Sequence, residues 1–114
     1  MTYGTRAQFE AVRELAFGSI SGTYAALGTA LTENSRITCI CNSTDVDIYI
    51  SVDGINNNFR LASNSFRLID FSTNKIRDDG LFVAKGTLFY AKQAAGGPTR
   101  GNVWLEVISA NGAN

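Results

Sequence analysis

Histidine is absent from this 114-residue sequence, and its absence removes whole classes of chemistry. Without histidine the chain has no Ser-His-Asp or Cys-His arrangement and no imidazole base. Glycoside cleavage needs two carboxylates held across a cleft. The acids that fall within predicted strands are Asp47, Asp70 and Glu106, and nothing in the sequence brings two of them together. We therefore expect that the protein is not an enzyme.

Net charge and long apolar runs are lacking as well. Lys plus Arg and Asp plus Glu both total 10, and the arginines are scattered singly. Phosphate binding relies on clustered Lys and Arg, so we expect no nucleic-acid partner. No apolar run exceeds four residues, whereas a spanning helix needs about 20 and a signal peptide about 7 to 15. The sequence therefore predicts no membrane association and synthesis in a cytosol.

Cysteine is scarce, and its two copies are Cys39 and Cys41. On a strand their Cα atoms would be ~6.6 Å apart, near the upper limit for a disulfide, so a bridge between them is not expected. Zinc is bound by about four nitrogen or sulfur ligands, and the chain offers no other cysteine and no histidine. We expect no metal site and interpret both residues as buried, reduced core cysteines.

Two further motifs give no ligand site. Asp45, Asp47 and Asp53, with the asparagines at 56–58 nearby, offer oxygen ligands for calcium, but their spacing does not match an EF-hand loop. Solvation of exposed acids is the simpler interpretation. The glycine-rich loop at 96–101 lacks the Gly-Lys-Ser/Thr ending of a phosphate-binding loop. No cofactor is expected.

The clearest structural signal is the stretch 37–52. Ile37, Cys39 and Cys41 alternate with more polar neighbours, as do the four aliphatic residues from Val46 to Val52. This period-2 pattern is typical of strands with one buried face. Turn-forming residues at 42–45 separate the two halves. The pattern predicts a central β-hairpin with Cys39 and Cys41 on its core face, ending at the Asp53-Gly54 turn.

The remaining sequence predicts further short strands separated by turn residues. About seven or eight strands at roughly 8 to 12 residue spacing indicate an all-β, antiparallel β-sandwich, jelly-roll-like in form. We expect residues 1–12 to form an extended N-terminal arm, residues 13–108 a single domain, and residues 109–114 a flexible tail. The segment 94–101, which contains the only proline, should be a flexible loop.

Two aromatic residues are expected to point outward. If Val103, Leu105 and Val107 face the core, Trp104 faces out, and Tyr49 does so by the same reasoning. Exposed Trp and Tyr can stack on sugars or anchor a protein interface. The alternative is that Trp104 packs under a loop or that both faces of its strand are covered. Gly97 and Arg100, at the tip of the 94–101 loop, are a second candidate contact point.

Three segments together carry a resemblance to a known group of proteins. They are Arg13-Glu-Leu-Ala-Phe-Gly-Ser-Ile-Ser-Gly-Thr-Tyr-Ala-Ala-Leu-Gly28, Thr44-Asp-Val-Asp-Ile-Tyr-Ile-Ser-Val-Asp-Gly54 and Gly80-Leu-Phe-Val-Ala-Lys-Gly-Thr87. In this order they resemble small structural proteins encoded among the virion genes of tailed bacteriophages. The arm before Arg13 has no counterpart in that resemblance.

The resemblance implies a non-enzymatic virion component, made in the host bacterial cytoplasm. Its role would be a decoration (cement) protein on the capsid shell or a ring-forming part of the head–tail connector. Its partners would be the major capsid protein, connector or portal subunits, and further copies of itself. We expect the arm, with Tyr3 and Phe9, to reach a neighbouring subunit. The alternative function is a carbohydrate-binding β-sandwich that contacts a host surface through Trp104 and Tyr49.

Overall fold

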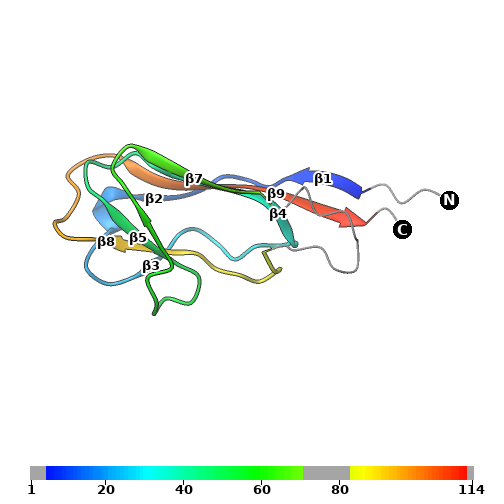
Figure 1. Cartoon of the computed structure of the whole chain (residues 1–114), viewed down its shortest axis with the longest axis horizontal. Helices are drawn as coiled ribbons and strands as arrows, with labels where there is room; N and C mark the ends of the chain where they lie inside the picture. The colour runs from blue at the N-terminus through cyan, green and yellow to red at the C-terminus, as the bar shows by residue number, and fades with distance from the viewer. Residues whose placement is uncertain (1–4, 71–82, 113–114) are drawn as a thin grey trace.

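The computed structural model describes residues 5–70 and 83–112. Their regular structure is β-strand apart from one short 3₁₀ helix, and the strands form two antiparallel sheets (Figure 1). Within the described residues the strands are β1 (Thr5–Phe9), β2 (Arg13–Ala16), β3 (Ala25–Ala26), β4 (Ser35–Asn42), β5 (Ile48–Ser51), β6 (Phe59–Leu61), β7 (Ser65–Asp70), β8 (Tyr90–Gln93) and β9 (Asn102–Gly112); the 3₁₀ helix η1 is Phe17–Ser19. The predicted all-β, antiparallel class is confirmed, and the two sheets are compatible with a β-sandwich.

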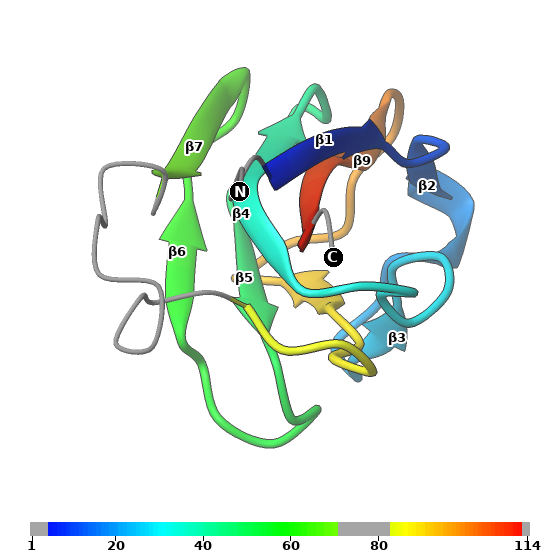
Figure 2. The same cartoon turned by 90° about the vertical axis from the view of Figure 1, so that its right-hand side faces the viewer.

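The two sheets contain different strands and differ in strand order. Sheet A has the order β1-β9-β4-β7, and β2 also pairs with β9, next to β1 along the same edge. Sheet B has the order β3-β8-β5-β6. The view along the long axis shows β9 and β4 across the core from β5 and β8 (Figure 2). The molecule measures 54 × 23 × 21 Å, and β1 with the end of β9 extends along the long direction (Figure 1).

The core lies between the sheets and is filled from both. Strand β9 contributes Val103, Leu105 and Val107, which are at most 3% exposed. Strand β5 contributes Ile48 and Ile50, both fully buried. The predicted inward face of the last strand is therefore confirmed. The alternation with polar residues such as Glu106 made the inward face of this strand predictable from the sequence, because a half-buried strand places every second side chain in the core.

The predicted central hairpin is wrong. Strand β4 belongs to sheet A and β5 to sheet B, so the stretch 37–52 crosses from one layer to the other. Asn42 stabilises this crossing and is 2% exposed. Its amide nitrogen donates to the carbonyls of Val46, Leu61 and Ala62 at 3.0 to 3.2 Å. Its amide oxygen accepts hydrogen bonds from the backbone N–H and the hydroxyl of Thr44. These bonds satisfy a buried polar corner, which the sequence could not distinguish from a surface turn.

The predicted core face of β4 is also wrong. Thr38, Ile40 and Asn42 point inward and are at most 2% exposed, whereas Cys39 and Cys41 lie half-buried on the opposite face. Odd-numbered and even-numbered positions of this strand both include an apolar residue, so the alternation alone allows either set to face the core. Pairing chooses between them, because Ile40 lies opposite the buried Leu105 of β9.

The N-terminal arm and the C-terminal tail also differ from expectation. Residues Thr5–Phe9 form β1, paired in register with the end of β9 from Phe9↔Ile108 to Thr5↔Gly112. The same pairing continues β9 to Gly112, so residues 109–112 are strand and the hydroxyl-bearing Ser109 is fully buried. The two segments satisfy each other's backbone hydrogen bonds, which neither would do as a free end.

Candidate functional site

The outward-facing side of sheet A carries a group of mainly apolar side chains around Glu106. Strand register arranges them in three rows across the sheet. Ile108 lies between Phe9 and Ile37 in the first row. Cys39 lies between Leu68 and Glu106 in the second. Cys41 lies between Phe66 and Trp104 in the third. We call this set the outer A face: Phe9, Ile37, Cys39, Cys41, Phe66, Leu68, Trp104, Glu106 and Ile108.

Large apolar side chains of the outer A face are open to solvent. Phe9 is 80% exposed, Phe66 66% and Leu68 54%. Between β1 and β7 the face is hollowed into a depression of about 440 Å³, whose floor includes Ile37 and Ile108. Contiguous exposed apolar surface of this kind marks interaction sites on soluble proteins. The outer A face is therefore the candidate functional site.

Sequence reasoning missed most of this surface. Phe9 and Trp104 were named as contact residues, but Phe66, Leu68 and Ile37 were not. The available signal was β4 itself, in which the apolar residues Ile37, Cys39 and Cys41 share one parity. Because the other set, Thr38, Ile40 and Asn42, is the buried one, these apolar residues are left on the outer face.

The outer side of sheet B differs in character. Tyr49 lies between Arg60 and Lys92 across the sheet. The Arg60 guanidinium and the Lys92 ammonium lie 5.8 and 6.0 Å from the centre of its ring. Lys92 also lies 4.7 Å from the ring centre of Tyr24. Cations over aromatic rings therefore give this face a charged, hydrated character.

The predicted contact residues fall into two separate places. Phe9 and Trp104 both lie on the outer A face, Phe9 at the β1 edge and Trp104 half-buried on β9. Gly97 and Arg100 are exposed in the loop before β9, at the opposite end of that strand from β1 (Figure 1). Tyr3 lies outside the described residues. The structure thus joins two of the five candidates in one surface.

The 94–101 loop, predicted to be flexible, is tied to the corner between the sheets. The backbone N–H of Thr99 donates to Oδ1 of Asp45 at 2.8 Å, and the Thr99 hydroxyl donates to Oδ2. These hydrogen bonds, the hydroxyl's first, lower the pKa of Asp45. Gly101 follows with φ of +92°, and a Cβ there would meet the carbonyl oxygen of Ser43 at 2.2 Å. Arg100 is therefore presented on an anchored loop.

Tyr49 and Trp104 do not form one binding platform. Tyr49 is on the outer side of sheet B, with its neighbours Ile48 and Ile50 in the core. Trp104 is on the outer side of sheet A, with Val103 and Leu105 in the core. The two rings point away from opposite layers, so a single sugar cannot stack on both. Trp104 is also covered on one side by Cys41, with which its side chain hydrogen bonds.

The three aspartates considered as calcium ligands occupy three separate turns. Asp47 accepts from Arg60 at 2.9 Å and from the Ser63 backbone. Asp53 accepts the backbone N–H groups of Ile55 and Asn56 at 2.8 and 2.9 Å. These two backbone bonds, Asn56 first, lower the pKa of Asp53. Asp45 holds the 94–101 loop, so each carboxylate caps a turn of its own.

The two thiols lie close together on the outer A face. Their Sγ atoms are 3.7 Å apart and both cysteines are free. Burial, and then the neighbouring Cys39, raise the pKa of Cys41 to about 11. Cys41 is therefore a thiol at neutral pH, which does not suit it to act as a nucleophile.

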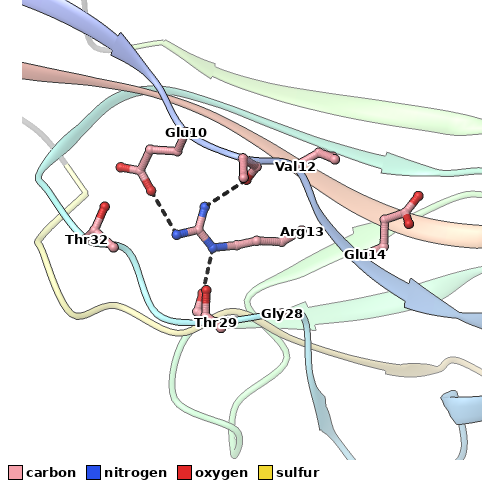
Figure 3. Close-up of a pocket in the computed structure, with 8 residues that line it drawn as sticks. Glu10, Val12, Arg13, Glu14, Gly28, Thr29 and Thr32 are labelled. Carbon is pink, nitrogen blue, oxygen red and sulfur yellow. Dashed lines mark hydrogen bonds and ion pairs between the residues drawn. The ribbon is translucent and has the colours of Figure 1, made fainter.

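The edge of sheet A next to β3 holds a buried ion pair that sequence reasoning did not identify (Figure 3). The Arg13 guanidinium donates to Glu10 Oε1 at 2.8 Å, and the two side chains are 7% and 9% exposed. Arg13 also donates to the carbonyls of Thr29 and Ala30 at 2.7 and 3.1 Å. The pair thus fastens the 27–31 segment to the β1–β2 edge.

A change of register creates this pair. The β1 pairing places Phe9 opposite Ile108, whereas the β2 pairing places Arg13 opposite Leu105. One extra residue is therefore inserted between Glu10 and Arg13, a β-bulge that turns Arg13 inward onto the same face as Glu10. Burial would raise the pKa of Glu10, but hydrogen bonding and the charge of Arg13, with nearby hydroxyls, outweigh it and lower that pKa. In the adjoining depression Glu10 Oε1 is paired with Arg13, whereas the buried Oε2 has no hydrogen-bond partner among the described residues.

Comparison with protein-family models, with curated proteins and with solved structures finds no match for the chain. Among the residues described, no helix has the length and apolar character needed to cross a membrane. Over the part of the chain that the structure describes, the fold is all-β, with two antiparallel sheets and a largely apolar outer face on sheet A.

Proposed function

We propose that the protein is a non-enzymatic structural component of a tailed-phage virion, attached to the capsid shell as a decoration protein or built into the head–tail connector. The observation that carries the proposal is the outer A face. A virion part needs a rigid body and surfaces for neighbouring subunits, and this face offers apolar contact area on a sheet rather than on a loop. The resemblance of the segments 13–28, 44–54 and 80–87 to virion proteins points the same way.

Energetics favour a partner that makes many simultaneous contacts. Fully burying a Phe or Leu side chain is worth about 1.5–3 kcal/mol. Phe9, Phe66 and Leu68 together would contribute several kcal/mol, which is similar to the estimated ~4–15 kcal/mol cost of association. One such contact is weak, whereas the same contact repeated over linked copies is strengthened by avidity. A multi-copy particle provides that repetition, and we include homo-oligomer formation in the proposal.

Strand edges add a second means of attachment. Within the described residues β1 pairs with β9 alone and β7 with β4 alone, so each leaves one edge open. An open edge accepts a strand from a neighbouring chain through main-chain hydrogen bonds. Strand β1 then acts in two ways: Phe9 contributes to the outer A face, and the open edge of β1 is offered to the neighbour. The jelly-roll-like form of the sandwich is part of this proposal.

Point substitution tests the proposal better than deletion of residues 1–9, which would remove β1 from the sheet. Phe9→Gln and Phe66→Gln should reduce the number of copies per virion, measured by quantitative mass spectrometry of purified particles. Ile55→Gln is the matched control, because Ile55 is 78% exposed but lies in the turn after β5. Native mass of the isolated chain reports self-association. Equal occupancy for all three variants would refute an attachment through the outer A face.

A further inference from the structure

One cluster on the outer A face has the composition of a metal site. Among the described residues, Cys39, Cys41 and Glu106 form a group whose ligand atoms all lie within 4.8 Å of one another. The cysteines are neighbours on one face of β4, and Glu106 of β9 lies directly opposite Cys39. Glu106 is 67 positions from Cys39 in the chain, so strand pairing and not a local cysteine or histidine motif brings the carboxylate to the thiols.

The sulfur separation matches the bite of a tetrahedral ion. Two thiolates bound at about 2.3 Å to one tetrahedral zinc lie about 3.8 Å apart. The Sγ atoms of Cys39 and Cys41 are 3.7 Å apart, on a strand held on both sides by paired neighbours. Binding therefore requires no movement of the β4 backbone, and the site is preorganised in the sense that lowers the cost of binding.

We propose that Cys39, Cys41 and Glu106 form an open, three-ligand site for a soft divalent metal ion of the zinc class. Two sulfur ligands favour Zn²⁺ or Cd²⁺ over Mg²⁺ or Ca²⁺, which prefer oxygen alone. Three protein ligands leave the fourth tetrahedral position open, as in zinc sites that bind water or a further ligand. The site lies between Leu68, Phe66 and Trp104, so that position faces whatever covers the outer A face.

Proton release on metal binding is a second measurable property of the site. Only the thiolate binds the metal, so each cysteine gives its proton to solvent when its sulfur–metal bond forms. Metal binding by the two thiols therefore releases two protons per ion, and affinity rises with pH.

Cadmium titration of the isolated full chain tests the site, and its result does not depend on the virion proposal. The thiols are kept reduced with a phosphine, which does not compete for the metal as a dithiol would. We expect thiolate-to-metal charge-transfer absorption that saturates at one ion per chain, with release of two protons. Cys39→Ser and Cys41→Ser should abolish the absorption, with circular dichroism confirming that each variant is folded.

The carboxylate has its own matched control. Glu106→Gln should weaken cadmium binding by at least about tenfold, since even outer-shell changes at metal sites cost that much. Glu14→Gln should leave binding unchanged, because Glu14 lies beyond Trp104 in the same sheet. No charge-transfer band at millimolar cadmium, equal affinity in Glu106→Gln, or one ion per two chains would each overturn the three-ligand site.

Discussion

Glu10 and Arg13 form an ion pair at 2.8 Å that is almost entirely closed to solvent at the edge of sheet A. Arg13 adds hydrogen bonds to two carbonyls of the 27–31 segment, whose other side is held by backbone hydrogen bonds to residues 86–89. The ion pair thus links the two layers at the point where the β1–β2 edge changes register.

Stability should fall in acid because of Glu10. Its pKa in the folded protein is lowered below the ordinary value of 4.5. The stabilisation is therefore present above the unfolded value of 4.5 and is lost as the pH falls through the lower folded pKa. Urea midpoints from neutral pH to below pH 4.5 measure this. The Glu10→Gln variant should be less stable at neutral pH, and its difference from the parent should shrink in acid. A constant difference would contradict the assignment.

Gly28 should not tolerate a side chain. Its φ is +72°, and a Cβ there would stand 2.5 Å from the Cβ of Arg13. Gly28→Ala is expected to cost about 1–3 kcal/mol, from backbone strain and displacement of the ion pair. Gly18→Ala is the control, because a Cβ at Gly18 has nothing within 4 Å. Thermal unfolding of both should show a lower midpoint for Gly28→Ala alone.

Asn42 should be among the positions most sensitive to substitution. Asn42→Asp replaces an amide that donates to three carbonyls with a carboxylate that can donate to none. Leaving such groups buried and unpaired costs about 1–3 kcal/mol each. Asn58→Asp is the control at an exposed asparagine. Chemical denaturation should show a loss of at least about 2 kcal/mol for Asn42→Asp; a loss no larger than that of Asn58→Asp would contradict the structural role.

The anchor between Asp45 and Thr99 should protect the loop before β9 from proteolysis. Arg100 is exposed, so trypsin can reach the bond after it once the loop opens. Asp45→Asn weakens the hydrogen bonds to Thr99 and should speed cleavage after Arg100 several-fold. Asp47→Asn, whose partners are Arg60 and Ser63, should leave that rate unchanged. Peptide mapping over time gives both rates, and unfolding midpoints separate local from global opening.

How far the sequence predicts this fold depends on the strand. In β9, Val103, Leu105 and Val107 alternate with Glu106, so the inward face is evident from the chain alone. In β4 the apolar residues Ile37, Cys39 and Cys41 share one parity, yet the other set is buried, because Ile40 pairs with the buried Leu105. Pairing between distant segments is not written in local periodicity.

The same limit applies to the candidate site. Phe9, Cys39, Leu68 and Ile108 come from four strands, and their contiguity is a property of register across β1, β9, β4 and β7. The prediction of a hairpin at Asn42 failed for a different reason. A polar turn sequence is the same whether its side chains hydrogen-bond to water or to carbonyls of a neighbouring layer.

The pairing of β1 with the end of β9 has a consequence for how the protein is made. Ser109 donates a hydrogen bond to the carbonyl of Gln8, 101 positions away. Contacts of such separation slow folding, because a long loop must close before they contribute. Until β9 is made, sheet A is limited to the β4–β7 pair, and β1 and β2 have no strand to pair with among the described residues. Completion of sheet A therefore waits until β9 has emerged from the ribosome.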